Sequence, residues 1–173
     1  MSAEVKRPSL AEVCTQLEAH RLPRWEEIPE LELYMDQVLS LVHRYLNAYP
    51  GYEEKGLTAS MVNNYVKAGL LPPPVKKRYT RVHLARLLVI CVLKASLPIP
   101  MIGEILGSAA IREDQRDFYD RFCRQFETTN REVASAYRNN GADSLTDTVC
   151  RAALRAQAEQ ALAGRLSPAV STR

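Results

Sequence analysis

Apolar residues recur at helical spacing over most of the chain. The clearest run lies between two breaks at Pro29 and Pro50, where apolar side chains follow one another three or four positions apart. It comprises Leu31, Tyr34, Met35, Val38, Leu41, Val42, Tyr45, Leu46 and Tyr49. Acidic residues at 30 and 32 suit the positive N-terminal end of a helix. We therefore predict a helix over residues 30–49.

The start of the chain predicts a shorter helix. Ser9 is a suitable N-cap for a helix that ends near His20, with Leu10, Val13 and Leu17 near one face. The two prolines of RLPRWEEIPE then break the pattern. Trp25 lies in this break, and a ring packed on neighbouring helices is a simpler reading of it than a binding site.

A third helix is predicted over residues 58–68. Thr58 or Ser60 can cap it, and Gly69 can end it. Its apolar face consists of Met61, Val62, Tyr65 and Val66. Its polar face consists of Ser60, Asn63, Asn64 and Lys67. Adjacent asparagines are poor helix formers, but their amides can bond to an adenine edge or to a phosphate oxygen.

Residues 72–79, PPPVKKRY, are predicted to be extended or turned and are called here the proline–lysine loop. Thr80 follows as an N-cap. Residues 82–97 are apolar on nearly every side, which is typical of a buried central helix. Pro98 and Pro100 end it, and a short helix is predicted over residues 101–106.

The C-terminal third predicts two more helices. The first runs from about Arg112 to Arg138 and carries an aromatic stripe of Phe118, Phe122, Phe126, Val133 and Tyr137. Core packing or dimer packing explains this stripe better than a cofactor site, and we expect this helix to form the interface of a homodimer. Residues 139–144 break the pattern, and Ser144 with Asp147 resembles a capping box that opens a helix over residues 145–166.

Composition agrees with an all-α chain, because glycine is scarce and 46% of the residues are apolar. Cys14, Cys91, Cys123 and Cys150 are far apart and indicate buried or half-buried, reduced thiols, with no zinc site or disulfide framework. The start of the chain lacks a secretion signal, and the longest apolar run is too short for a membrane span. We expect a soluble cytoplasmic protein with no cofactor or metal.

No pattern of an enzyme stands out. His20, His43 and His83 are separated in the sequence, and no zinc-protease, nucleophile-elbow, P-loop or dinucleotide motif occurs. His83 adjoins the basic run and is read either as a phosphate contact or as a solvated residue near a helix cap. We expect no enzymatic activity.

Charge is unevenly distributed along the chain. Between residues 55 and 103 there are eight basic residues and no acidic residue, so this window carries +8 and the rest carries 3 − 8 = −5. The basic residues are Lys55, Lys67, Lys76, Lys77, Arg78, Arg81, Arg86 and Lys94. Such an excess is expected of a surface that meets a polyanion, although it can also pair with acidic helices of the same chain.

The segment MVNNYVKAGLLPPP, followed by KKRYTRVHLARLLVI, resembles the winged helix-turn-helix of the MerR family of bacterial transcription regulators. The matching positions are Tyr65, Gly69, Leu70, Arg78, Tyr79 and Leu84. The longer stretch LTASMVNNYVKAGLLPPPVKKRYTRVHLA is similar to an uncharacterised bacterial family of unknown function grouped with these folds. The resemblance spans about residues 25–110.

The resemblance implies three segments. Residues 1–29 would form an N-terminal helical arm, residues 30–110 a MerR-like DNA-binding domain, and residues 111–173 helices for dimerisation. The chain is then expected to be a sequence-specific transcriptional regulator that binds double-stranded DNA as a homodimer. The residues expected to contact DNA are Ser60, Asn63, Asn64, Tyr65, Lys67, Lys76, Lys77, Arg78, Tyr79 and Arg81.

One departure from the MerR pattern keeps a second hypothesis open. Where those regulators carry Arg-Tyr-Tyr-Glu, this chain has Asn63, Asn64, Tyr65 and Val66, so the arginine that reaches a phosphate is missing. The alternative is a protein-interaction module that uses the winged scaffold without reading DNA. The C-terminal third also lacks the cysteine pair of a MerR metal loop.

Overall fold

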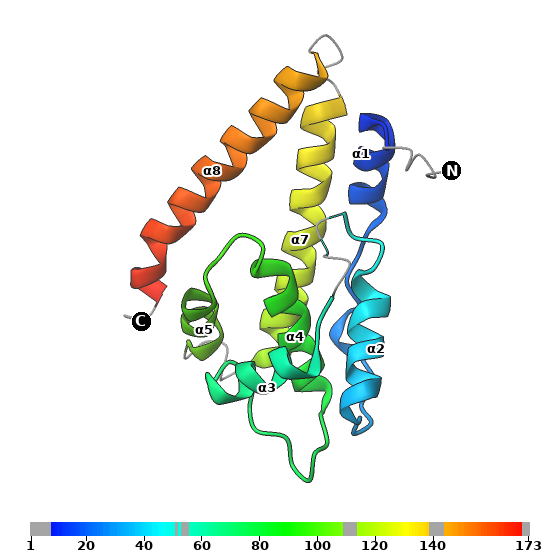
Figure 1. Ribbon diagram of the computed structural model, residues 1–173, viewed down its shortest axis with the longest axis vertical. Helices are drawn as coiled ribbons and strands as arrows, with labels where there is room; N and C mark the ends of the chain where they lie inside the picture. The colour runs from blue at the N-terminus through cyan, green and yellow to red at the C-terminus, as the bar shows by residue number, and fades with distance from the viewer. Residues whose placement is uncertain (1–7, 51, 53–55, 109–113, 139–143, 171–173) are drawn as a thin grey trace, which may run out of the picture.

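A computed structural model describes residues 8–50, 52, 56–108, 114–138 and 144–170. This part of the chain is helical and contains two isolated β-bridges but no strand, which confirms the predicted all-α class (Figure 1). The helices are α1 (Leu10–Ala19), the 3-10 turn η1 (Trp25–Glu27), α2 (Met35–Leu46), α3 (Ala59–Lys67), α4 (Arg81–Leu93), α5 (Ile99–Gly107), α7 (Gln115–Arg138) and α8 (Leu145–Val170).

The centre of the main core is α4, as its unbroken apolar pattern predicts. Eight of its residues are buried, from His83 to Cys91 with only Arg86 left out. It contacts α2, α5 and α7, and the cluster around it also takes in Val62 and Tyr65 of α3. A helix that is apolar on all sides must be covered on all sides, so the other helices pack around α4.

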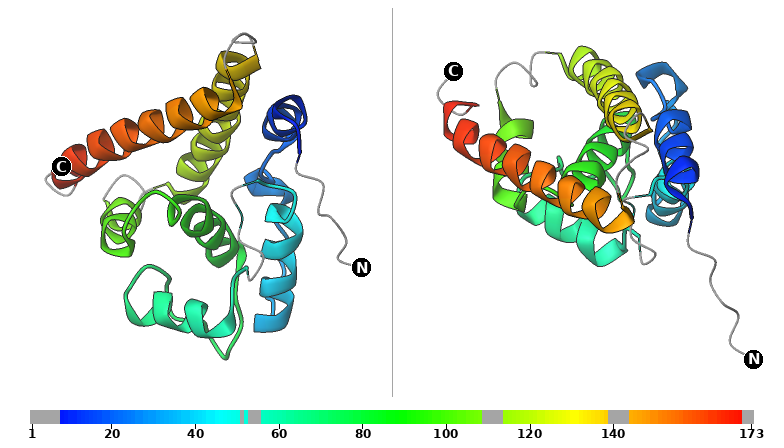
Figure 2. Two further views of the ribbon diagram at one scale, coloured as in Figure 1. Left: turned by 45° about the horizontal axis from the view of Figure 1, so that its top comes forward. Right: turned by 90° about the horizontal axis from the view of Figure 1, so that it is seen from above.

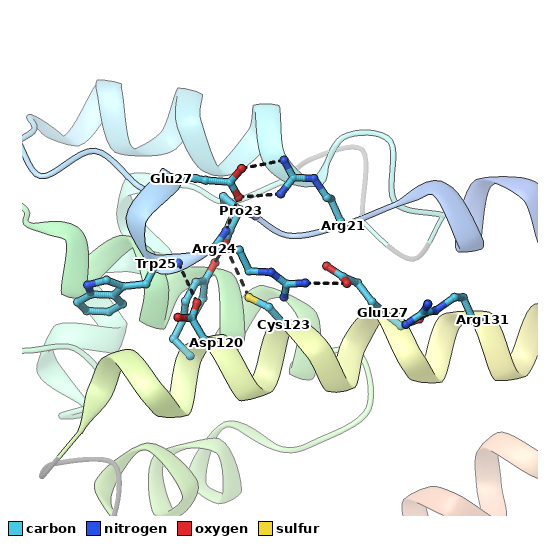
Figure 3. A network of polar contacts seen from close by, with 10 residues as sticks. Arg21, Pro23, Arg24, Trp25, Glu27, Asp120, Cys123, Glu127 and Arg131 are labelled. Atoms are coloured by element: carbon cyan, nitrogen blue, oxygen red, sulfur yellow. Dashed lines mark hydrogen bonds and ion pairs between the residues drawn. The ribbon is translucent and has the colours of Figure 1, made fainter.

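Polar contacts tie the segment between α1 and α2 to α7 (Figure 3). Arg24 forms an ion pair of 2.8 Å with Glu127, and the backbone N–H of Trp25 donates to Asp120 at 2.9 Å. The buried Tyr119 hydroxyl donates to the carbonyl of Pro23 at 2.9 Å. Because Pro23 and its neighbours are held in this way, Leu22 and Ile28 join the main core.

The aromatic stripe of α7 belongs to the core of its own chain. Phe126 and Tyr137 are buried, and Phe118 and Phe122 are packed against the main cluster. The stripe therefore packs against its own chain, as the core reading predicts. The three segments expected from the sequence also share one core, because Leu22 precedes residue 29 and Tyr119 follows residue 110.

The predicted helix over residues 30–49 is shorter in the structure. It begins at Met35 and ends at Leu46, and Leu31 is 75% exposed. Residues before Met35 are extended because Leu33 forms two backbone hydrogen bonds with Tyr79, of 2.8 and 2.9 Å. A long-range bridge has thus replaced the first turns that the local pattern favours.

The last helix lies at the edge of this bundle. It leaves the end of α7 and runs back past α5, which it contacts (Figures 1 and 2). Ser144 and Asp147 cap it as predicted: the Ser144 hydroxyl accepts from the backbone of Asp147 and donates to its carboxylate. Only Thr148 is buried among the side chains described on this helix.

Candidate nucleic-acid interface

The two faces of α3 divide as its sequence predicts. Val62 and Tyr65 are buried against the main core. The opposite side exposes Ser60, Asn63, Asn64 and Lys67. The Thr58 hydroxyl accepts a hydrogen bond of 3.3 Å from the backbone of Met61 and so fixes the start of the helix. A short helix is therefore anchored by one face and presents amides and an amine on the other.

The end of α3 is fixed by its backbone. Gly69 has a φ of +76°, and its N–H donates to the carbonyl of Val66 at 3.1 Å. The N–H of Leu70 donates to the carbonyl of Tyr65 at 2.9 Å. These two bonds form a Schellman motif, in which the left-handed residue is most often glycine. The motif turns the chain sharply into the proline–lysine loop.

The proline–lysine loop is a tight hairpin. Val75 and Arg78 form a bridge, closed by a hydrogen bond of 2.9 Å from the N–H of Arg78 to the carbonyl of Val75. Lys76 and Lys77 occupy the tip with φ of 49° and 62°. Positive φ at both central residues defines a type I′ turn, which normally takes Asn and Gly. Two lysines therefore occupy a strained position and are both exposed.

His83 joins this hairpin to the start of α4. Its Nδ1 accepts a hydrogen bond of 3.0 Å from the N–H of Thr80, and its Nε2 lies 3.1 Å from the carbonyl of Pro72. The ring must then be neutral with its proton on Nε2, so that Nε2 donates to Pro72. Burial lowers the pKa of this imidazole. His83 lies at the helix cap as predicted, but its ring is only 5% exposed and is therefore neither solvated nor open to a phosphate.

An open cleft of about 540 Å³ separates α3 from the hairpin. Asn63 lines one wall, and Pro74, Lys77 and Tyr79 line the other. The start of α2 supplies Tyr34, Met35 and Asp36. At its edge the guanidinium of Arg78 lies over the ring of Tyr34, with 3.7 Å between the guanidinium carbon and the ring centroid. Such a cation–π contact orients the arginine while its N–H groups keep their capacity to donate.

Three residues expected to contact DNA lie inside the fold. Tyr65 and Tyr79 belong to the main core. Arg81 donates to the carbonyl of Ile28 at 3.0 Å and to Glu26 at 3.3 Å, and it lies beside Glu30. For Arg81, pairing with acidic residues of the same chain is therefore the correct reading. The exposed set is then Ser60, Asn63, Asn64, Lys67, Lys76 and Lys77, with Arg78 partly exposed.

Comparison with known protein families matches residues 23–140 to a domain of unknown function, DUF1836. The chain belongs to this family. The match agrees with the expected similarity to a family of unknown function, and it covers α3, the proline–lysine loop and α4. All of α1 and all described residues of α8 fall outside it. No curated protein and no solved structure matched the chain.

The described part of this DUF1836 chain also bears on metal binding, thiol chemistry and membrane insertion. Within it, no group of His, Cys, Asp or Glu side chains is arranged to hold a metal ion. Burial raises the pKa of both the Cys91 and the Cys123 thiol to about 11, which disfavours the reactive thiolate. Cys150 differs from the expectation because it is exposed. Among the described helices, none is long and apolar enough to cross a membrane.

Two residues of the DUF1836 domain's cleft were not foreseen. Tyr34 was assigned to the buried face of a helix, yet it is 49% exposed under Arg78. Asp36 adds a carboxylate to a cleft that the sequence predicts to be basic. A carboxylate repels phosphates but can accept from the amino group of cytosine. No local signal marks either residue, because their places depend on the bridge between Leu33 and Tyr79.

Proposed function

We propose that this DUF1836 protein is a sequence-specific regulator of transcription that binds double-stranded DNA through a MerR-like winged helix-turn-helix. In this proposal α3 is the recognition helix, and the proline–lysine loop is the wing. Asn63 and Asn64 read base edges in the major groove, with Ser60 beside them. Lys76, Lys77 and Arg78 contact phosphates. A homodimer reads two half-sites of a pseudo-palindrome.

The observation that carries the proposal is the cleft shared by α3 and the hairpin. Asn63 and Lys77 lie on its two walls, so a residue assigned to base contacts and a residue assigned to phosphate contacts line the same cleft. The strained lysines support the same reading. A type I′ turn with Asn-Gly would be more stable, so keeping two cations there favours a role in binding.

The decisive experiment is selection from random duplexes over a range of salt concentrations. One enriched motif is the expected result, with an affinity that falls steeply as salt increases. The Lys76→Ala/Lys77→Ala variant should bind all sequences more weakly. The slope of log affinity against log salt concentration should become less negative by about 0.9 for each phosphate that the variant no longer neutralises.

A matched variant removes two charges elsewhere. Arg124 and Arg131 are exposed on α7, away from the cleft, and Arg124→Ala/Arg131→Ala should leave affinity and salt slope nearly unchanged. Asn63→Ala should instead relax the preferred motif, at a cost of about 1–3 kcal/mol for a good base contact. Equal effects of the two charge-removing variants would refute the assignment of the wing.

The second candidate is a protein-interaction module on the same scaffold. It is favoured by Asp36 in the cleft and by Asn63 and Asn64 at the place where MerR regulators carry an arginine. The basic tip would then meet an acidic protein surface. Failure of the duplex selection to enrich any motif, with purified protein that carries no nucleic acid, would favour this function.

A further inference from the structure

A pocket lies between α1, α7 and α8, at the end of the molecule where α8 follows α7 (Figure 1). Its volume is about 270 Å³, and none of the residues that line it carries a charge. It shares no residue with the cleft beside α3. A molecule bound here would therefore leave the candidate nucleic-acid interface uncovered.

Helical periodicity builds the walls of this pocket. On α8 the lining residues are Leu145, Thr148, Val149 and Ala152, spaced i, i+3, i+4 and i+7 along one face of the helix. On α1 the lining residues follow the same spacing between Leu10 and Leu17, and α7 contributes residues between 133 and 137. The walls on α1 and α8 lie outside the DUF1836 match, so these two helices add the pocket to the domain.

The pocket has a buried floor and an exposed rim. Cys14, Ala134 and Tyr137 form the small cluster between α1 and α7, and each of them is at most 8% exposed. Leu145 and Val149 also line the pocket, yet they are 72% and 60% exposed. An apolar molecule in the pocket would cover these aliphatic side chains, and the removal of their surface from water would favour binding.

The size of the pocket selects a small molecule over a segment of protein. A closed apolar cavity of about 150 Å³ holds one benzene ring, so a volume of about 270 Å³ corresponds to about ten non-hydrogen atoms. One turn of a helix about 10 Å wide and about 5.4 Å long fills a cylinder of about 400 Å³. A helix of another protein is therefore too large to enter.

One polar group on α8 can orient such a molecule. The Thr148 side chain is only 8% exposed, and its hydroxyl can both donate and accept a hydrogen bond. Ligand sites commonly combine apolar walls with a few polar groups of this kind. We propose that the pocket binds an uncharged organic molecule of about ten non-hydrogen atoms, with one hydroxyl or carbonyl group held by Thr148.

The first test uses 1-naphthol, which has two fused rings and one hydroxyl, and the full chain without DNA. The change in its fluorescence on titration should be saturable, with one molecule bound to each chain. In methyl-labelled NMR spectra, the largest shifts should fall on residues that line the pocket: Leu10, Val13, Leu17, Val133, Leu145 and Val149. Absence of saturable binding, or shifts centred on another part of the chain, would overturn the proposal.

Two tryptophan substitutions separate filling of the pocket from a general change in α8. Ala152 lines the pocket, whereas Ala161 lies on the opposite side of the same helix, and both are exposed. Ala152→Trp should weaken the binding of 1-naphthol at least about tenfold, because the indole occupies the site. Ala161→Trp should bind it as the wild type does, and both variants should melt near the wild-type temperature. Equal affinities of the two variants would contradict the assigned site.

The role of Thr148 is tested with Thr148→Val, which keeps the shape of the side chain and removes its hydroxyl. The affinity for 1-naphthol should fall about threefold to tenfold, which is the usual effect of losing one hydrogen bond. The affinity for 1-methylnaphthalene, which carries a methyl group in place of the hydroxyl, should stay nearly unchanged. An equal change for both compounds would refute the hydrogen bond to Thr148.

Discussion

At the scale of single residues, His83 connects the candidate interface to the stability of the fold. Its neutral ring accepts from Thr80 and donates to Pro72, so the base of the hairpin is fixed by one buried imidazole. A proton on Nδ1 would remove the bond from Thr80. The ring faces Tyr79, and the positive charge of Arg86 nearby adds to the lowering of its pKa by burial.

We predict that acid weakens the fold through this residue. The pKa of His83 is lowered in the folded state, so the unfolded chain binds the proton more readily. The contribution to stability is complete above the unfolded pKa of about 6.5 and is lost as the pH falls through the folded value. Burial lowers the pKa of His20 in the same direction.

Urea unfolding at several pH values between neutrality and mild acid checks this prediction. His83→Gln should reduce the loss of unfolding free energy with falling pH, and a double variant with His20→Gln should reduce it further. An unchanged pH dependence in the double variant would contradict the assigned protonation state.

The two lysines at the hairpin tip give a second prediction. A left-handed conformation costs about 1–2 kcal/mol for each ordinary residue. Lys76→Asn/Lys77→Gly supplies the residues that a type I′ turn prefers and should raise the unfolding free energy by about 1 kcal/mol. That gain corresponds to about 2–4 °C in melting temperature for a chain of this size.

Lys76→Ala/Lys77→Ala is the control for this change. It removes the same charges without relieving the backbone, so its melting temperature should stay near that of the wild type. Both variants should bind DNA equally weakly under the proposed function. A variant with Asn-Gly that is no more stable than the Ala-Ala variant would argue against strain at the tip.

At the scale of elements, the end of α3 depends on the conformation of one glycine. No atom lies within 4 Å of the position that a Cβ on Gly69 would take, so the cost of Gly69→Ala comes from φ alone. We predict a decrease of about 1–2 kcal/mol in unfolding free energy.

Gly164 in α8 is the matched control, because its surroundings are equally open and its φ is not in the left-handed region. Gly164→Ala should increase helix content and stabilise α8 by about 0.5–1 kcal/mol. Thermal unfolding followed by circular dichroism measures both changes. The same sign for the two substitutions would contradict the Schellman motif.

Helices whose start and end have local causes could be predicted from the sequence. Ser9, Thr58 and Ser144 each cap the expected helix, and Gly69 ends α3. The start of α2 could not be predicted in this way. Leu31 and Tyr34 continue the helical spacing, and only the distant bridge between Leu33 and Tyr79 shows why the chain is extended there.

The candidate site was predictable to the same extent. The polar face of α3 can be predicted from its helical periodicity. The basic tip of the hairpin can be predicted because Lys76 and Lys77 lie in the proline–lysine loop. The role of Arg81 depends on Glu26, 55 positions away, and that of Tyr34 depends on the fold of the hairpin. A basic residue in an acid-free window can thus be a structural residue, because its partners come from another segment.

At the scale of the whole molecule, the core of the bundle and α8 are distinct. The main core draws on α2, α3, α4, α5 and α7 and contains no residue of α8. The helix α8 contacts α5, and near its start Thr148 is buried and Arg151 lies over Tyr137. Changes in α8 should therefore affect the stability of the main core only slightly.

We accordingly predict that a chain ending at residue 144 keeps the bundle. It should no longer form the homodimer of the proposed function, which is expected to use the C-terminal helices. Its melting temperature should fall only slightly, because removal of α8 exposes the small cluster of Cys14, Ala134 and Tyr137 and leaves the main core covered. Light scattering should report a monomer. On a palindromic duplex, this monomer should bind with about half the salt slope of the full chain, because it neutralises half as many phosphates. Cooperative unfolding with an unchanged dimer would place the interface elsewhere on the bundle, whereas a collapse of the melting transition would mean that α8 is part of the fold.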